Sequence, residues 1–426
     1  MTGDCHVRIC EGLGVKFPWA TRLNIRDEKQ DVRELLSCFS VAFSRPSFKL
    51  FSSFVIGFIQ LGKETHTSTM VQSLSFSFLH RSVSSFTRFL GQNVWAMEKV
   101  AETALYQFFH TLRIKAHSVL FLIMDDTLAE KTGKKIPGCA WHRDHTQKTY
   151  VFGHQWVLSA LLYKDFLLPL WGKLYHPKGT RGWGPFQTKI TLAKRMLQAL
   201  RLPIPCKVYF LVDSWYWAKE LALLCRKCGY HMISQLKSNS VLWVNGKRTK
   251  VTTLCTLASA YREVSLFLYG KHKTLQIAKF IGTIRDLDKV AVVVVKERGK
   301  KPYYLVSTNL HLSALDILKY YAKRWKIEQM IKDLKQRLGF GDYQVRNPKA
   351  IQRHVALALL SYCVLILLKI LQWLRDKTVS LDLSIRSLAF HVRRHILSEN
   401  ITVTLKCMKI RFKQNILDSY LEQLWA

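Results

Sequence analysis

A polar stripe along residues 320–340, which read YYAKRWKIEQMIKDLKQRLGF, is the first feature of the sequence that suggests chemistry. The stretch has no Pro, and its only Gly falls near the end, where a helix would stop. Polar residues spaced by three or four positions recur within it: Tyr321, Arg324, Glu328, Lys332 and Lys335. At ~100° per residue they share an arc of roughly 80°. The spacing therefore predicts a helix face with one carboxylate among basic and phenolic groups.

Acidic residues also follow two apolar, β-rich runs. Asp125 and Asp126 come after SVLFLIM, and Asp213 comes after KVYFLV. Acids at the ends of buried strands can converge on one edge of a sheet, where we expect them to meet Glu328. Carboxylates in one place repel one another, and a hard divalent cation relieves that repulsion and accepts phosphate oxygens. These acids are therefore the predicted ligands of two Mg²⁺ or Mn²⁺ ions, which can activate a water or a 3′-hydroxyl at a phosphodiester.

The alternation of side chains along a strand limits this metal site. Neighbouring residues of a strand point to opposite faces, so only one of Asp125 and Asp126 can face the metals. The other would be a hydrogen-bond acceptor behind the site or an exposed turn acid.

The basic residues of the stripe gain a purpose beside such a metal site. Arg324, Lys332 and Lys335 would bind phosphates next to the ions, and Tyr321 would donate a hydrogen bond to a phosphate. The alternative is a surface salt-bridge ladder, because Glu328 has a basic partner four residues away on each side. The two acidic strand ends and the net charge favour the functional interpretation.

The charge of the whole chain points to a polyanionic partner. The 426 residues include 65 Lys and Arg against 29 acids, a formal charge of +36, and such an excess favours nucleic acid first and anionic lipid second. The apolar run from Val355 to Leu368 is about 14 residues long, short of the ~20 that a spanning helix needs, so we expect a buried core helix and no membrane. The scattered Cys residues give no sign of an oxidising compartment, and we expect a cytoplasmic protein.

The order of elements predicts an α/β fold. Helical patterns come first, including two short helices around a turn in 67–91, and strands alternating with helices begin near Ser118. A β-rich segment, with a hairpin signal at Asn245-Gly246, then interrupts the alternation. The predicted divisions are an extension of open role (1–45), a helical DNA-binding domain (46–115), a first part of the core (116–235), a β-rich insertion (236–305), a second part of the core with the stripe (306–375) and a basic helical segment (376–426).

The spacing Tyr321-x2-Arg324-x3-Glu328-x6-Lys335 resembles the Y-R-E-K signature of a large group of bacterial insertion-sequence transposases. These are DDE enzymes with a ribonuclease-H-like core, a mixed sheet flanked by helices. The D-x-T motif of the group is matched at Asp125, and LVDSWY matches its second Asp motif at Asp213. GHQWV (153–157) and the stretch 343–354 are also similar, so the resemblance covers roughly residues 45–375.

The resemblance implies a role for each matching residue. Asp125, Asp213 and Glu328 become the catalytic, metal-binding triad, which favours Asp125 over Asp126. The basic and phenolic residues of the stripe become contacts to double-stranded DNA at the element ends. The β-rich insertion helps to hold the transposon end or a hairpin intermediate, and Trp243 within it is a candidate for stacking on a flipped base.

The resemblance also implies the activity. The protein is expected to bind terminal inverted repeats, cleave the ends by two-metal hydrolysis and transfer the 3′-hydroxyls to target DNA, acting as a homodimer in a bacterial cytoplasm. Two alternatives stay open: a metal-dependent nuclease without strand transfer, and a catalytically inactive DNA-binding protein derived from a transposase.

Overall fold

The structure, a computed structural model, describes residues 28–73, 81–144, 148–180, 182–257, 261–284, 287–375 and 384–407. Residues 1–27, most of the predicted extension, lie outside this part of the chain, as do the last 19 residues. The α-helices and short 3₁₀-helices (η) are α2 Glu28–Ser37, η1 Cys38–Ala42, α3 Arg45–Leu61, α4 Thr67–Ser73, α5 Val83–Gly91, α6 Met97–Thr111, α7 Lys189–Ala199, α8 Lys219–Lys227, η2 Val251–Thr253, α9 Leu254–Leu257, α10 Ala314–Ala322, α11 Trp325–Arg337, α12 Pro348–Arg375 and α13 Ile385–Cys407.

One twelve-stranded mixed sheet runs through the protein. Its strands are β1 Val119–Glu130, β2 Ala140–Asp144, β3 Thr149–Tyr163, β4 Phe166–Tyr175, β5 Lys207–Val212, β6 His231–Leu236, β7 Val241–Val244, β8 Lys247–Lys250, β9 Arg262–Leu268, β10 Lys271–Thr283, β11 Lys289–Glu297 and β12 Tyr303–Ser307. The order is β2-β3-β1-β5-β6-β12-β11-β10-β7-β8, with β4 paired to β3 and β9 paired to β10. β1, β5 and β6 are parallel to one another, and β1 is antiparallel to β3.

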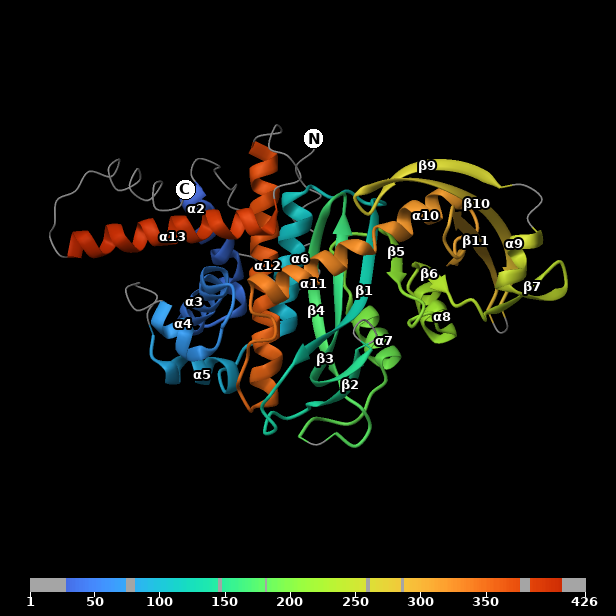
Figure 1. Ribbon diagram of the computed structural model, residues 1–426. Helices are drawn as coiled ribbons and strands as arrows, with labels where there is room; N and C mark the ends of the chain where they lie inside the picture. Colours follow the sequence, from blue (N-terminus) through green and yellow to red (C-terminus); the bar gives the residue numbers. More distant parts are fainter. Residues whose placement is uncertain are drawn as a thin grey trace.

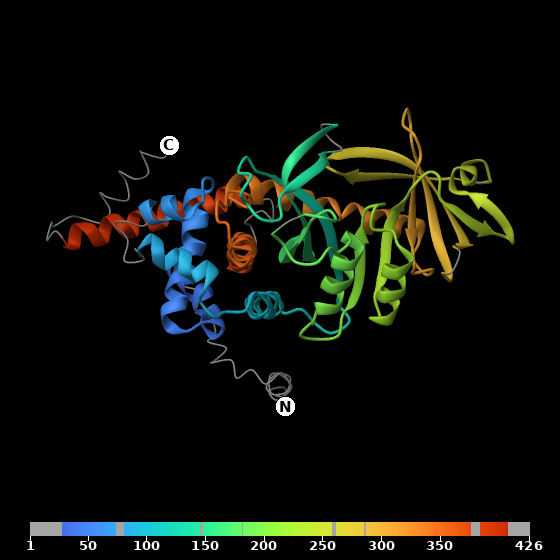
Figure 2. The ribbon, with the colours of Figure 1, turned by 90° about the horizontal axis from the view of Figure 1, so that it is seen from below.

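Helices cover both faces of this sheet. Figure 2 shows α10 and α11 on one face and α7 and α8 on the other. Figure 1 shows α12 standing between the N-terminal helices and the strands. The predicted mixed α/β architecture with N-terminal and C-terminal helices is confirmed, and it is consistent with a ribonuclease-H-like core; the domain boundaries stay predictions.

α12 is the central support of the helical part. It packs against α2, α3, α5, α6 and β4, so its residues between Val355 and Leu368 are buried, apart from the half-buried Ala356. α12 is the one helix of the described residues that is long and apolar enough to cross a membrane, but 89% of its apolar window is buried inside the protein. The expected core helix is confirmed.

A buried cation joins α12 to the N-terminal helices. The Arg353 guanidinium donates hydrogen bonds to the carbonyl oxygens of Phe89 (3.1 Å), Leu90 (3.1 Å) and Trp95 (2.7 Å), and it stacks 4.3 Å from the Trp95 ring. Phe89 and Leu90 end α5, where the helix dipole is negative, so the charge is stabilised without a carboxylate.

The β-rich segment extends the core sheet. β12 pairs with the core strand β6, and β11, β10, β7 and β8 follow. The predicted hairpin is present between β7 and β8, with positive φ at Asn245 (50°) and Gly246 (77°), as a two-residue turn of this type requires. The large core spans the N-terminal helices, β1 and α12, and a second, smaller core including Leu242 and Val292 lies within the insertion.

The single helix expected over 320–340 is wrong, because α10 ends at Ala322 and α11 begins at Trp325. At the break, Lys323 N donates to Tyr320 O (3.1 Å), and Arg324 N donates to Tyr321 O (2.9 Å). These bonds span three residues, not four, and tighten the backbone locally. Tyr321 is buried, and its hydroxyl lies near Arg324 and Asp213.

α11 ends at the predicted glycine and is held there by the N-terminal helices. Gly339 has φ +55°, its N–H donates to Gly62 O (3.1 Å), and its carbonyl oxygen accepts from Thr65 Oγ1 (3.1 Å). A Cβ on Gly339 would lie 1.8 Å from Thr65 Oγ1. The end of the helix that carries the stripe is thus fixed by a contact that leaves no room for a side chain.

We expect Gly339→Ala to lower the free energy of unfolding by about 3–5 kcal/mol, because the left-handed backbone strain adds to the clash with Thr65. Gly299→Ala is the matched control, since Gly299 also has a positive φ (+75°) but nothing within 4 Å of its Cβ position. The control should lose only about 1–2 kcal/mol in urea unfolding. Equal losses would show that the contact with Thr65 does not hold α11.

Candidate active site

Two of the predicted acids lie at the same level on neighbouring parallel strands. The pairing of β1 with β5 ends at Ile123 and Leu211, and Asp125 and Asp213 are each two residues beyond that pair. β1 itself continues to Glu130 along β3, so Asp125 and Asp126 lie within the strand and not at its end, as the sequence had suggested. The edge on which the acids meet is therefore made by the end of β5.

Arg324 joins Asp125 to Glu328. Its Nη1 donates to Asp125 Oδ2 (2.7 Å), and its Nη2 donates to Glu328 Oε1. Glu328 lies in the first turn of α11, where the helix dipole favours a negative charge. Arg324 is at the break that precedes this helix, so the tightened backbone places its guanidinium between an acid of the strand and an acid of the helix.

The electrostatics of this group reflect its burial. Desolvation raises the pKa of Asp125 to about 6, with Asp213 and Asp126 adding to the rise and Arg324 opposing it. Desolvation also raises the pKa of Asp213, although the backbone N–H of Tyr216 stabilises its charged form. Burial works against the charge of Arg324, but the neighbouring acids outweigh it and raise its pKa.

Asp126 faces the opposite side of the sheet, as alternation requires. Its Oδ2 accepts from Lys189 Nζ at the start of α7 (2.9 Å) and from Gln155 Nε2 on β3, and its Oδ1 lies 3.4 Å from the Tyr216 hydroxyl. The Asp126 carboxylate is therefore already paired on the α7 side. This geometry favours Asp125 over Asp126 as the ligand on the α11 side, and the metal role of each stays a prediction.

The break in the helix separates Tyr321, on α10, from Lys332 and Lys335, on α11. The Tyr321 hydroxyl donates to Gln235 Oε1 on β6 (3.4 Å), and burial raises its pKa to about 12. Lys332 and Lys335 lie on the exposed side of α11, accessible to solvent. Burial lowers the pKa of Lys335, and Asp144 lies near it. The Tyr321 hydroxyl also lies near Arg324 and Asp213, so Tyr321 belongs to the group of residues around the acids.

Trp243 is not brought to the acids. It lies half-buried on β7, opposite Arg248 of β8 and Thr283 of β10, and five strands separate β7 from β1 in the sheet (Figure 1). The insertion reaches the site through the turn between β9 and β10 instead. There the Tyr269 ring lies 5.7 Å from the ring of Trp325, the residue after Arg324.

These contacts were missed from the sequence, although signals for some existed. Tyr269-Gly270 joins two strand-like runs and is a turn signal, and Trp325 lies inside the stripe itself. Trp215, two residues after Asp213, lies within the LVDSWY motif, which gives no sign that its side chain is exposed. Nothing in the sequence indicates that Lys189, on a distant helix, pairs with Asp126.

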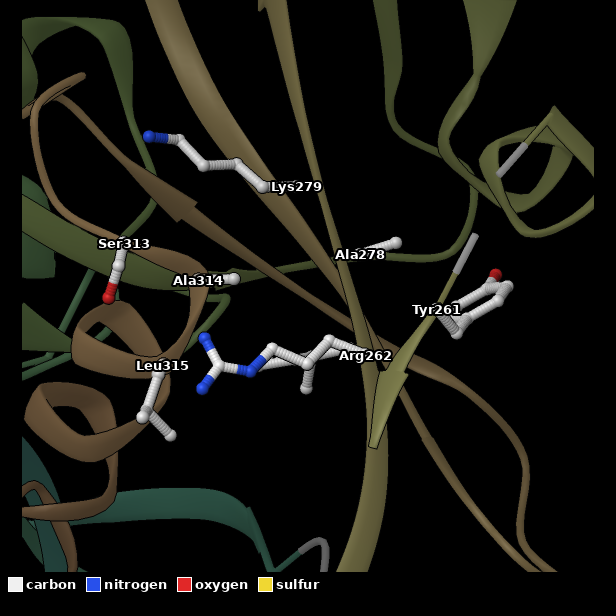
Figure 3. A pocket seen from close by; sticks show the side chains of 8 residues that line it. Tyr261, Arg262, Ala278, Lys279, Ser313, Ala314 and Leu315 are labelled. Carbon is white, nitrogen blue, oxygen red and sulfur yellow. The ribbon is translucent and has the colours of Figure 1, made fainter. Parts of the chain in front are cut away.

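A hollow of about 320 Å³ lies where the insertion meets the start of α10 (Figure 3). The Arg262 side chain extends toward Ser313 and Leu315, and Lys279 Nζ donates to the carbonyl oxygens of Leu310 (2.7 Å) and Leu312 (2.6 Å). The lining residues are Tyr261, Arg262, Ile277, Ala278, Lys279, Ser313, Ala314 and Leu315. Both charged residues of the lining are basic, which suits contact with a polyanion.

The acidic side chains offer the ligands that a divalent cation prefers. In this structure, however, Asp125 and Glu328 are paired with the Arg324 guanidinium. Asp125, Asp213 and Glu328 supply the carboxylate oxygens that Mg²⁺ and Mn²⁺ prefer. Within the described ranges, no three acidic, His or Cys side chains are gathered closely enough to hold a metal ion. The reason is visible in the contacts, because the Arg324 guanidinium lies between Asp125 and Glu328.

Comparison with known proteins agrees with this geometry. Residues 187–364 match the family model described as a transposase DDE domain, and residues 55–253 match the one described as a DDE superfamily endonuclease. Asp213 and Glu328 fall in the first range, and Asp125 falls in the second. No curated protein matches the chain. Over these ranges the chain is similar to DDE transposase and endonuclease domains, and that similarity implies transposase-like cleavage and transfer of DNA and the general use of divalent metal ions.

We expect Arg324→Ala to lower the stability of the metal-free protein by roughly 1–3 kcal/mol, because two partly buried carboxylates lose their shared donor. Melting in EDTA measures this change, and added Mn²⁺ should restore more stability to the variant than to the parent protein. Lys332→Ala, an exposed change on the same helix, should stay within about 0.5 kcal/mol of the parent. If the two variants melt alike in EDTA, Arg324 is not the cation that holds these acids.

Proposed function

We propose that this DDE-domain protein is a DNA transposase. It binds the terminal inverted repeats of its element, cleaves the ends by hydrolysis at phosphorus with two Mg²⁺ or Mn²⁺ ions, and transfers the 3′-hydroxyl ends to target DNA. The observation that carries the proposal is the placement of Asp125 and Asp213 at one level of neighbouring strands, with Arg324 linking Asp125 to Glu328 on α11. These acids come from positions 125, 213 and 328, so a surface salt-bridge ladder along one helix does not account for the arrangement.

Each acid in this proposal has a role set by its position. Asp125, Asp213 and Glu328 hold the ions, which when bound activate the attacking oxygen and stabilise the leaving one. Asp213 presents one oxygen, because its Oδ1 already accepts from the backbone N–H of Trp215 (3.0 Å) and Tyr216 (3.3 Å). Arg324 moves from the acids to a phosphate of the DNA, where its fork of donors matches the phosphate oxygens.

The basic surface gives the DNA a path to the acids. Lys332 and Lys335 on α11 contact the strand beside the scissile phosphate, and Arg262 and Lys279 at the hollow meet the duplex farther along. α4 and α5 are the helices that we assign to recognition of the repeats. α5 begins at the cap residue Ser82 and exposes Thr87 and Arg88.

The assembly follows from the reaction. Two ends must be cut and joined together, so we propose a homodimer in which each copy holds one end. The origin in a bacterial insertion sequence and the cytoplasmic location are parts of the same proposal, and they are supported by the Y-R-E-K spacing from Tyr321 to Lys335.

Two rivals share the same residues. A nuclease without strand transfer has the same acids, and a transposase-derived binding protein has the same basic surface. The retention of Asp125 and Asp213 at one edge, with Glu328 linked to them through Arg324, supports an active enzyme over the binding protein.

We expect Glu328→Gln to abolish cleavage while leaving salt-sensitive DNA binding within about threefold, because one metal ligand is lost and the basic surface is unchanged. The substrate is a plasmid with the DNA that flanks the coding region, incubated with Mg²⁺ or Mn²⁺. Glu130→Gln, an exposed acid at the end of β1, is the control and should cut normally.

The products separate the rivals. Excision with insertion supports the transposase, and cleavage without joining supports the nuclease. Shifted bands without cleavage by the parent protein support the binding protein. Cleavage by the Glu328→Gln variant at the parent rate would refute the assignment of the triad.

Lys335→Ala should weaken binding to the element ends and reduce the slope of log affinity against log salt by about one, because one phosphate contact is lost. Fluorescence anisotropy between about 50 and 200 mM salt measures that slope. An unchanged slope would remove Lys335 from the DNA-binding surface.

A further inference from the structure

An exposed tryptophan lies at the edge where the acids meet. Trp215 follows Asp213 by two residues and is 55% exposed, whereas the next residue, Tyr216, is fully buried. The backbone N–H of Trp215 donates a hydrogen bond to Asp213 Oδ1 (3.0 Å). The backbone that carries the indole is therefore tied to the proposed metal ligand. The buried Tyr216 ring anchors the same turn in the core, while the Trp215 indole extends into solvent.

Two cations flank this indole. Lys189 Nζ lies 5.4 Å and Lys237 Nζ 5.5 Å from the centroid of the Trp215 ring. Lys189 begins α7 and is also paired with Asp126, so its position is set by the core. Lys237 follows directly after β6, at the same carboxyl edge of the parallel strands as Asp213, and is exposed.

A purely structural role does not explain this arrangement. A cation–π contact at an exposed site is worth about 0.5–1 kcal/mol. That is small beside the free energy that the protein would gain by burying a large aromatic ring, which here stays exposed to water. An aromatic face between basic side chains is the pattern by which proteins bind single-stranded nucleic acid, with the base on the ring and the backbone along the cations.

We propose that Trp215, Lys189 and Lys237 form a subsite for one unpaired nucleotide beside the scissile phosphodiester. The base stacks on the indole, the exposed Lys237 binds a neighbouring phosphate, and Lys189, which is paired with Asp126, flanks the ring on the side of the core. The nucleotide must be unpaired, because the faces of a base within a duplex are covered by its neighbours. The inference rests on the proposed function, since it names what the DNA near the cut presents to the enzyme.

The experiment separates stacking from charge. The full chain in EDTA is titrated against two labelled oligomers of equal charge: one of about 12 thymidines, and one of equal length built from abasic sites. We expect the parent protein to bind the thymidine oligomer more tightly. Trp215→Ala should lose roughly tenfold in affinity for the thymidine oligomer and almost none for the abasic one. Trp215→Phe should keep most of the difference, because a phenyl ring still stacks.

Matched controls make the result specific. Trp141→Ala removes another indole that is exposed to a similar degree (65%), on β2, and should leave both affinities unchanged. Lys237→Ala should weaken both oligomers equally and lower the salt slope by about 0.7.

Two results would overturn the inference: a Trp215→Ala variant that keeps the parent's preference for bases, or one that loses both oligomers to the same extent. If the parent protein binds neither oligomer nor the element ends, the proposed function fails as well. Binding of the ends with no preference for bases overturns the subsite alone.

Discussion

Repulsion among carboxylates that the sheet brings to one edge is the constraint on which the rest of the site depends. The register of β1 against β5 sets Asp125 and Asp213 at one level, and α11 adds Glu328. In the protein alone, the Arg324 guanidinium offsets part of that repulsion. Arg324 lies at the break between α10 and α11, and its side chain reaches both Asp125 and Glu328. The irregular backbone therefore occurs at the residue that balances the charge of the two acids.

The N-terminal helices support the elements that carry the acids through contacts far from the acids themselves. Gly339 ends α11 against the loop at Gly62, and Arg353 ties α12 to the end of α5. The helix with Glu328 packs against β1, β4, α12 and α13, and the residues after its end meet the loop at Gly62. A region expected to bind DNA therefore also helps to position the acids.

The sequence was informative where local patterns decide the outcome. Apolar runs predicted the strand that carries Asp125 and the strand that Asp213 follows, Asn245-Gly246 predicted the hairpin, and the glycine at 339 predicted the end of α11. Alternation correctly required Asp125 and Asp126 to face opposite sides. What failed depends on contacts distant in the chain: Arg324, at the break, pairs with Asp125 some 200 residues earlier, and the place of Trp243 follows from the order of strands in the insertion. The pairing of Lys189 with Asp126 has no local signal at all.

The continuous sheet has a mechanical consequence for the DNA. β12 pairs with β6, so hydrogen bonds run without interruption from the core strands into the insertion. The insertion is thus part of the same stiff surface as the acids, and Tyr269 at its turn meets Trp325 beside Arg324. A duplex that touches both must adapt its own curvature to the protein. On the proposed function, the cost of that deformation would depend on base-step stiffness, and so on sequence that the side chains do not read directly.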